Sequence, residues 1–194
     1  MSPILRRGVA VSCALVFLAA PHGLQAAQKT LRVDPASTHV TFSLDAGLHT
    51  VHGTAKLTEG TIVFDDAAGK ASGRVVVDAR SLESGNGSRD KTMHGDVLES
   101  AKYPEIVLVP ETLQGKVPAD GEADITLGGA LEIHGGRHAV SLPAHLKVTG
   151  EGIQGTARLD VPYVEWGMKD PSFFVLRVGK TVQVTLEITG RLGG

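Results

Sequence analysis

The sequence predicts an all-β domain, and three observations carry that prediction. Gly is frequent, at 24 of 194 residues, and occurs with many Val, Leu, Ile and Thr residues, which is the composition of turns and strands. Residues 138–148 and 181–189 alternate strictly between apolar and polar side chains, as strands do with one face on an apolar interior and the other in water. Gly- and Asp-rich turns separate such segments at hairpin spacing, which favours an antiparallel meander.

The first 27 residues have the layout of a secretory signal peptide. Arg6 and Arg7 form a positive region, an apolar run extends from Val9 to Ala20, and small residues follow, so we expect residues 1–27 to be removed. The alternative is a retained anchor, for which the apolar run is short. The only cysteine, Cys13, lies within that run. The mature chain is therefore expected to be periplasmic or secreted and to fold without a disulfide.

The remaining residues, 28–194, have the size of one domain with a single core, and no linker or repeat divides them. They carry 17 basic and 21 acidic side chains, a net charge near −4, and no basic cluster. This composition argues against a nucleic-acid partner and against stable binding to an anionic membrane, so any membrane contact is expected to be transient.

Nine patterned segments define the expected strands, in order along the chain. They cover residues 38–44, 51–57, 61–64, 74–79, 105–113, 122–133, 138–148, 153–163 and 181–189. Pro143 and Pro162 interrupt two of them; because proline has no N–H for the ladder, these positions are expected at edges or bulges. Eight or so strands in one domain indicate a closed barrel or a sandwich.

The choice between barrel and sandwich depends on what fills the interior. The inner faces carry mostly Val, Leu, Ile and Ala, and aromatic residues make up only 4% of the chain. A sandwich core is filled by large side chains from two sheets, whereas an eight-stranded barrel can hold one small ligand. The scarcity of bulky side chains favours a hollow barrel.

One charged segment, between the fourth and fifth of these strands, is predicted to be helical. Residues 86–88 (Asn-Gly-Ser) include residue types that are preferred at a helix N-cap. The apolar residues Met93, Val97 and Ala101 recur at four-residue spacing, which places them on one face of a helix. Pro104 is expected to end the helix, because the residue before a proline prefers extended geometry. The prediction is an amphipathic helix of two to three turns that closes one end of a barrel or covers a sheet edge.

This helix also carries the residue types of acid/base or acyl-transfer catalysis: His94, Asp96 and Ser100. Side chains two residues apart do not share a helix face, and Ser100 lies six residues from His94. The sequence has no G-x-S-x-G nucleophile motif. A solvated helix face is the favoured interpretation, and no catalytic residue is assigned.

Metal binding is not predicted either. His134 and His138 flank a Gly-Gly turn and could approach each other across a hairpin, but without a nearby carboxylate or cysteine they make a poor metal site. Asp65 and Asp66 are most economically part of a turn. We therefore expect no metal and no cofactor.

Four motifs in order resemble those of the YceI-like proteins, over about residues 31–190. They are Asp34, His39, Val40 and Phe42 followed by Val51-His52-Gly53; Arg89-Asp90 followed by Lys102-Tyr103-Pro104; residues 129–135 followed by Val140-Ser-Leu-Pro143; and Gly167-Met168.

The resemblance implies an eight-stranded antiparallel lipocalin-like barrel with a short helix over one end and a long apolar tunnel. Residues 28–194 would form this YceI-like lipid-binding barrel domain. Its implied function is periplasmic binding or transport of a long apolar lipid, such as a polyisoprenoid, an isoprenoid quinone or a fatty-acid-like molecule. Burial of each CH₂ group contributes ~0.8 kcal/mol, so binding such a lipid needs no reactive residue. We therefore do not expect the protein to be an enzyme.

Alternation along the strands gives the expected ligand-binding wall. A register error of one residue would turn a strand's side chains to the other face. The wall residues are Val40, Phe42, Leu44, Phe64, Leu108, Leu131, Leu142, Leu146, Phe173 and Phe174, with Tyr103, Tyr163 and Trp166 nearer an opening.

Two alternatives of other classes stay open. An enzyme acting on a small hydrophobic or lipid substrate would need His94 or Asp96 to project into the cavity. An accessory partner-binding module of a membrane redox or stress system would need an exposed apolar patch on the outer face. A homodimer that shares a strand edge near Pro143 or Pro162 is a further alternative.

Overall fold

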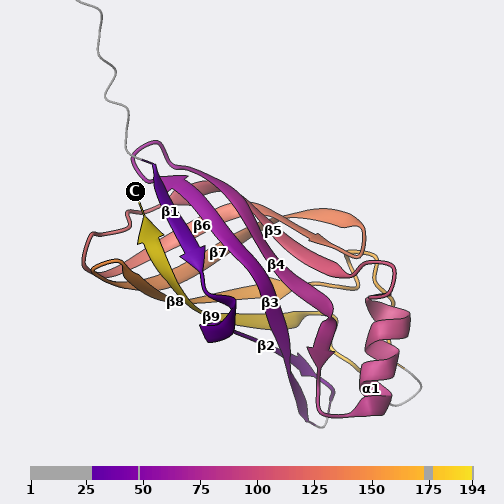
Figure 1. Ribbon diagram of the computed structural model, residues 1–194. Helices are drawn as coiled ribbons and strands as arrows, with labels where there is room; N and C mark the ends of the chain where they lie inside the picture. Colours follow the sequence, from indigo (N-terminus) through magenta and orange to yellow (C-terminus); the bar gives the residue numbers. More distant parts are fainter. Residues whose placement is uncertain (1–27, 48, 173–176, 194) are drawn as a thin grey trace, which may run out of the picture.

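The computed structural model describes residues 28–47, 49–172 and 177–193, and within them it confirms the all-β prediction (Figure 1). The predicted signal peptide, residues 1–27, and the predicted wall residues Phe173 and Phe174 lie outside the described residues. Within the described ranges, no helix has the length and apolar character needed to cross a membrane.

The elements follow one another as β1 (Lys29–Val33), β2 (His39–Asp45), β3 (Thr50–Asp65), β4 (Lys70–Glu83), α1 (Gly87–Thr92), β5 (Glu105–Gln114), β6 (Gly121–Ile133), β7 (Gly136–Thr149), β8 (Gly152–Val161) and β9 (Val182–Gly193). A 3₁₀ turn (Pro35–Ser37) separates β1 from β2, and a π-helical turn (Met93–Val97) continues α1.

The strands form one closed antiparallel barrel with eight strand positions. The sheet runs β3-β2-β9-β8-β7-β6-β5-β4 and closes through the pairing of β3 with β4. β1 and β2 share one position between β3 and β9: β1 pairs with the C-terminal parts of both strands, and β2 with their N-terminal parts. The 3₁₀ turn interrupts this shared position. Closure leaves no free sheet edge along most of the barrel.

Two strand predictions were wrong in detail. β1 was not predicted, because its five residues lack a long alternating pattern. Residues 51–57 and 61–64 were expected as two strands, whereas β3 runs unbroken from Thr50 to Asp65. Register shifts against β4 between Thr54 and Glu59 let this long strand bend around the barrel without ending.

Pro143 lies where β7 leaves β8, which confirms the expected edge. β7 pairs with β8 only from Ala144 to Thr149, whereas its first half pairs with β6 alone. Pro162 follows the last residue of β8 and ends that strand. The two strands therefore separate toward one end of the barrel and leave a seam there.

Gly73 shows how β4 curves. Its φ is +126°, and a Cβ at this position would lie 2.1 Å from the carbonyl oxygen of Thr61. It falls between Lys70 and Val75, where the register against β5 shifts. Only glycine fits this bend, which turns β4 around the barrel.

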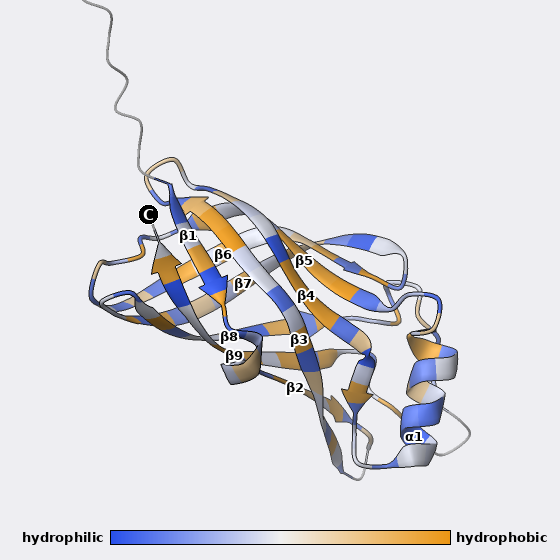
Figure 2. Ribbon diagram, in the orientation of Figure 1, coloured by the Kyte–Doolittle hydropathy of each residue, from blue (hydrophilic) through white to orange (hydrophobic). Residues whose placement is uncertain are grey.

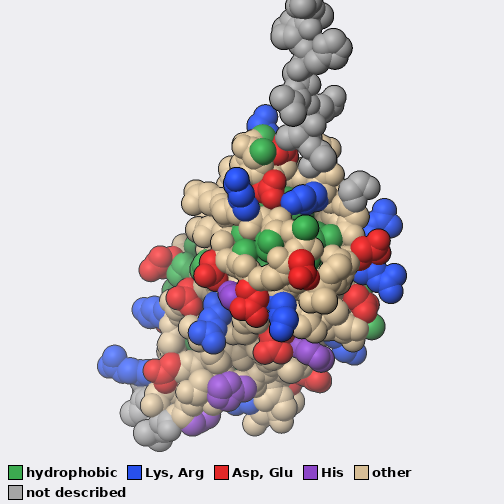
Figure 3. All heavy atoms as spheres, turned by 90° about the vertical axis from the view of Figure 1, so that its left-hand side faces the viewer, with side chains coloured by type: hydrophobic (Ala, Val, Ile, Leu, Met, Phe, Trp, Pro, Cys, Tyr) green, Lys and Arg blue, Asp and Glu red, His purple; other side chains and the backbone are tan. Residues whose placement is uncertain are grey.

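The half of the barrel away from α1 is solid. Val148 and Ile153 are only 1% and 2% exposed, and neighbouring strands contribute further buried side chains. Hydrophobic residues recur along the strands of the barrel (Figure 2). We call this packed layer the plug; it comprises Leu31, Leu57, Ile62, Phe64, Leu113, Leu127, Leu146, Val148 and Ile153. Acidic and basic side chains are interspersed over the outside of this end (Figure 3). The long tunnel expected from the resemblance is thus closed at this end.

Candidate functional site

An apolar cavity of about 560 Å³ occupies the half of the barrel next to α1. Side chains from every strand from β2 to β9 form its wall. α1 with its π-helical turn, residues 87–97, covers it; we call this segment the lid. Its few polar lining residues (His49, Ser84, Asn86, Ser88, Arg89 and Thr92) gather at the lid end, which we call the mouth. The cavity is therefore a blind pocket with an apolar body and a polar rim.

The structure brings seven of the predicted wall residues together. Val40, Phe42, Leu44, Leu108, Leu131, Leu142 and Tyr163 line the cavity. Phe42 fits closely, because its ring packs on Gly53, where a Cβ would lie 2.1 Å from the ring. That these side chains contact a lipid stays a prediction.

The other described candidates lie elsewhere. Phe64 and Leu146 face inward as predicted, but they belong to the plug and do not line the cavity. Tyr103 contacts the β6–β7 turn, with its ring centroid 4.8 Å from that of His134. Trp166 stacks on His138 at 4.2 Å, with the rings 4° from parallel. Alternation alone shows which side chains face inward, but not how far along the barrel they lie.

Sequence reasoning missed much of the wall on β4 and β9. Val75 and Val77 from β4, and Val184 and Leu186 from β9, line the cavity. The strict alternation of residues 181–189 carried the signal for β9, yet none of its residues entered the predicted wall. Met93 and Val97 also line the cavity, as the apolar stripe of the helix indicated.

The lid begins as predicted and ends earlier. The side chain of Asn86 accepts hydrogen bonds from the backbone N–H groups of Ser88 and Arg89, both at 3.1 Å, which confirms the N-cap. Glu99 has a φ of 45°, in the left-handed region, so helical geometry ends before it rather than at Pro104. Ala101 is consequently exposed and is not part of the apolar stripe.

Two contacts attach the lid region to the barrel loops. Glu99 Oε2 lies 2.7 Å from His134 Nε2, on the β6–β7 turn. Lys169 Nζ lies 3.5 Å from Asp96 Oδ1, between the β8–β9 loop and the lid. Only the Asp96 contact uses the polar face of the helix, and Asp96 accordingly does not line the cavity.

The expectation that His94 and Ser100 lie apart was wrong. His94 Nε2 donates to the carbonyl oxygen of Leu82 at 2.9 Å, so its Nδ1 accepts from Ser100 Oγ at 3.0 Å. The π-helical turn and the reversal at Glu99 return the chain toward His94. Ser100 is only 5% exposed, and neither side chain lines the cavity. The pair therefore ties the lid to β4, outside the space that the enzyme alternative requires.

We predict that Ser100→Ala lowers the free energy of unfolding by about 1–3 kcal/mol, because it leaves His94 Nδ1 without its partner. Urea denaturation measures the loss. The control is Ser141→Ala, which alters an exposed serine on the outer face of β7 and should change stability little. Equal stability of both variants would show that the His94–Ser100 bond contributes nothing.

The loop after β8 covers the seam between β7 and β8. His138 and Trp166 stack there, and Met168 N donates to the carbonyl oxygen of Tyr163 at 3.0 Å, which closes the loop on itself. His138 and His134 thus have different partners and do not form a pair. Among the described residues, no group of three or more His, Cys, Asp or Glu side chains is placed to hold a metal.

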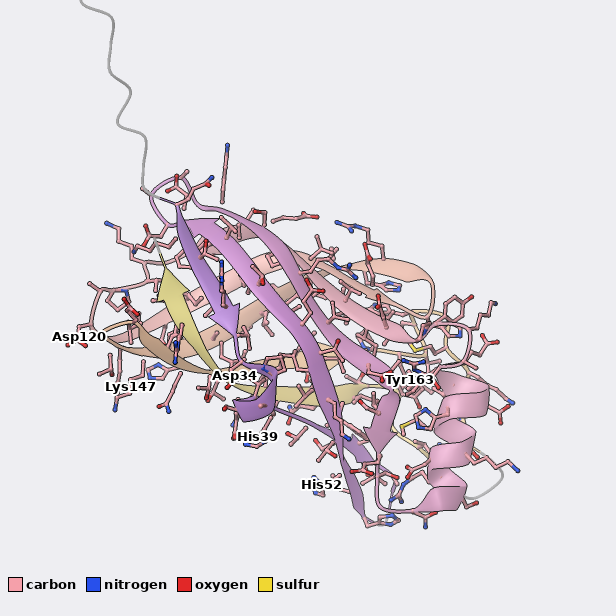
Figure 4. All side chains as sticks on the ribbon, viewed as in Figure 1. Asp34, His39, His52, Asp120, Lys147 and Tyr163 are labelled. Carbon is pink, nitrogen blue, oxygen red and sulfur yellow. The ribbon has the colours of Figure 1, made fainter. Side chains whose placement is uncertain are left out.

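Tyr163 joins the cavity wall to the loop before β9. It lies beside α1, whereas Asp120 and Lys147 mark the opposite end of the barrel (Figure 4). Its hydroxyl donates to the carbonyl oxygen of Gly179 at 2.9 Å. Burial, with a smaller contribution from Asp170, raises the pKa of Tyr163 from 10.0 to about 12.

This shift predicts a loss of stability at alkaline pH. Below pH 10 the phenol is protonated in both states; between pH 10 and 12 the unfolded chain loses the proton while the folded chain retains it, so the free energy of unfolding falls by about 2–3 kcal/mol. Tyr163→Phe removes this part of the fall and costs about 1 kcal/mol at neutral pH for the lost hydrogen bond. Urea denaturation of both proteins at pH 7 and pH 11 measures the difference. If the free energies of unfolding of the wild-type protein and Tyr163→Phe fall by the same amount from pH 7 to pH 11, the pKa of Tyr163 is not raised.

Comparison with known proteins gives consistent matches. A model of the YceI-like domain matches residues 31–190. A UPF0312 protein of Pseudomonas syringae pv. tomato is 30% identical over 183 residues, which cover 86% of each chain. A UPF0312 protein of Pseudomonas putida (strain W619) is 31% identical over 155 residues, which cover 76% of this chain and 72% of that protein.

Two solved structures share the fold. A polyisoprenoid binding domain from Saccharophagus degradans superposes with a TM-score of 0.64 at 15% identity, covering 84% of this chain and 98% of that one. BcnA of Burkholderia cenocepacia gives a TM-score of 0.63 at 19% identity, covering 81% and 98%.

Proposed function

The chain belongs to the YceI-like family, and we propose that it binds one amphiphilic lipid in the cavity, with the tail inside the barrel and the headgroup at the mouth. The observation that carries this proposal is the cavity itself: an apolar wall, a closed end and a polar rim on one side only. That division matches a molecule with one apolar and one polar end. A solved neighbour is a polyisoprenoid binding domain, which supports the same ligand class.

The energetics support binding without chemistry. Each CH₂ group that moves from water into the cavity contributes ~0.8 kcal/mol, so on the order of ten of them offset the cost of immobilising the ligand. The ligand class is a polyisoprenoid, an isoprenoid quinone or a fatty-acid-like lipid. With the predicted signal peptide, the proposal extends to carriage of this lipid across an aqueous periplasm.

Native mass spectrometry of protein purified from its own source, followed by organic extraction, tests this function. We expect a stoichiometric adduct that extracts as an apolar-tailed lipid. A ligand-free mass that also persists after incubation with an excess of isoprenoid and acyl lipids would contradict the proposal.

A further inference from the structure

We propose, on the premise that the cavity binds a lipid, that its ligand carries an oxyanion headgroup, a carboxylate or a phosphate, bound by Arg89. The same geometry limits the tail to the lid half of the barrel. Both statements go beyond binding of an apolar lipid as such, because they name the headgroup chemistry and set a maximum tail length.

Arg89 lies at the mouth with part of its hydrogen-bonding capacity free. It lines the cavity and is half-buried. Its Nε donates to Ser84 Oγ at 2.7 Å, and one terminal nitrogen donates to the carbonyl oxygen of Ser84 at 2.8 Å. A guanidinium has five N–H donors, so three are left, and no other acceptor among the described residues bonds to them.

The acidic groups near Arg89 do not neutralise it directly. Asp90 Oδ1 accepts from the backbone N–H of Ser84 at 2.9 Å and from its hydroxyl, so this carboxylate reaches Arg89 only through Ser84. Glu83 accepts from Thr54 Oγ1 at 3.5 Å. Within the described residues, no carboxylate forms an ion pair with Arg89.

The other groups at the mouth are weaker candidates. The side-chain oxygen of Asn86 already caps the helix, and Thr92 Oγ1 donates to the carbonyl oxygen of Ser88 at 3.4 Å. His49 is exposed. A half-buried guanidinium with a free planar edge binds carboxylate or phosphate with two parallel hydrogen bonds. The geometry at Arg89 therefore favours an oxyanion over a neutral headgroup.

The plug sets the tail length. Along the strands the cavity wall runs from Val182 to Leu186 on β9, about 13 Å, and from Val75 to Leu82 on β4, about 23 Å. The next inward side chains along the barrel belong to the plug, in which Val148 and Ile153 are nearly inaccessible. A tail longer than this depth has to fold back or displace packed side chains, so it gains no further burial.

Isothermal titration of wild-type protein with straight-chain carboxylic acids, alkyl phosphates and primary alcohols of matched length tests both statements. We expect the acid or the phosphate to bind about tenfold or more tightly than the alcohol of equal tail, since hydrogen bonds to charged groups contribute that much. Affinity should rise about fourfold per CH₂ and then stop rising. Whichever binds more tightly, the carboxylic acid or the alkyl phosphate, identifies the headgroup as a carboxylate or a phosphate.

Two variants locate the headgroup. Arg89→Gln should reduce acid binding to the level of the alcohol and leave alcohol binding unchanged. Lys91→Gln removes an exposed cation from the same helix and should change neither. If Arg89→Gln fails to fold, the wild-type protein's relative affinity for the acid and the alcohol still tests whether the cavity prefers an oxyanion headgroup.

The outcomes separate this inference from the proposed function. Equal affinity of wild-type protein for acids, phosphates and alcohols overturns the headgroup assignment. An affinity that keeps rising with tail length overturns the length limit. Binding of none of these compounds overturns the proposed function as well.

Discussion

Ala55→Phe is expected to weaken lipid binding about 100-fold without destabilising the protein. Ala55 lies on β3 opposite Val40 and lines the cavity. A phenyl ring there takes the space of about four CH₂ groups of a tail, worth about 3 kcal/mol of binding free energy. The ring fills existing space, so the free energy of unfolding should stay equal or rise.

Titration with a lipid that binds the wild-type protein, together with urea denaturation, measures both effects. The matched control is Ala139→Phe, which places the same ring on the exposed side of β7 and should leave binding unchanged. Wild-type affinity in Ala55→Phe would place the lipid outside this cavity.

Ile153→Ala is expected to lower the free energy of unfolding by about 2–5 kcal/mol. Ile153 is 2% exposed in the plug, and its truncation leaves a void among packed side chains. Removing part of the plug should also move the tail-length limit toward longer ligands.

The control for this second variant lies on the same strand. Leu159 also belongs to β8 but is half-buried and faces the cavity, so Leu159→Ala enlarges a space that already exists and should cost less. Urea denaturation compares the two. Equal losses would show that the two halves of the barrel are packed alike.

The sequence predicted the barrel well because its signals are local. Strict alternation over residues 181–189 and 138–148 identified β9 and β7, and Asn86 identified the start of the lid. The short strand β1 was not predicted, because five residues carry too little of an alternating pattern. The continuity of β3 was not predicted either, because a β-bulge resembles a turn in the sequence.

The candidate site was predicted less completely. Alternation placed Leu131 and Phe64 on the same inner surface, yet one lines the cavity and the other fills the plug. Their depth along the barrel depends on the register of strands that are distant in sequence. Arg89 appeared in the sequence only as part of a family motif and a charged helix face.

The sequence by itself determined the class of fold, the family and the apolar character of the interior, since these follow from residue type and from spacing along one strand or helix. Only the tertiary structure decided that the barrel is closed at one end, that His94 is hydrogen-bonded to Ser100, and that Arg89 lies at the mouth with unused N–H donors. Each of these depends on side chains from separate elements sharing one small volume. Such proximity is set by barrel closure, not by any local pattern.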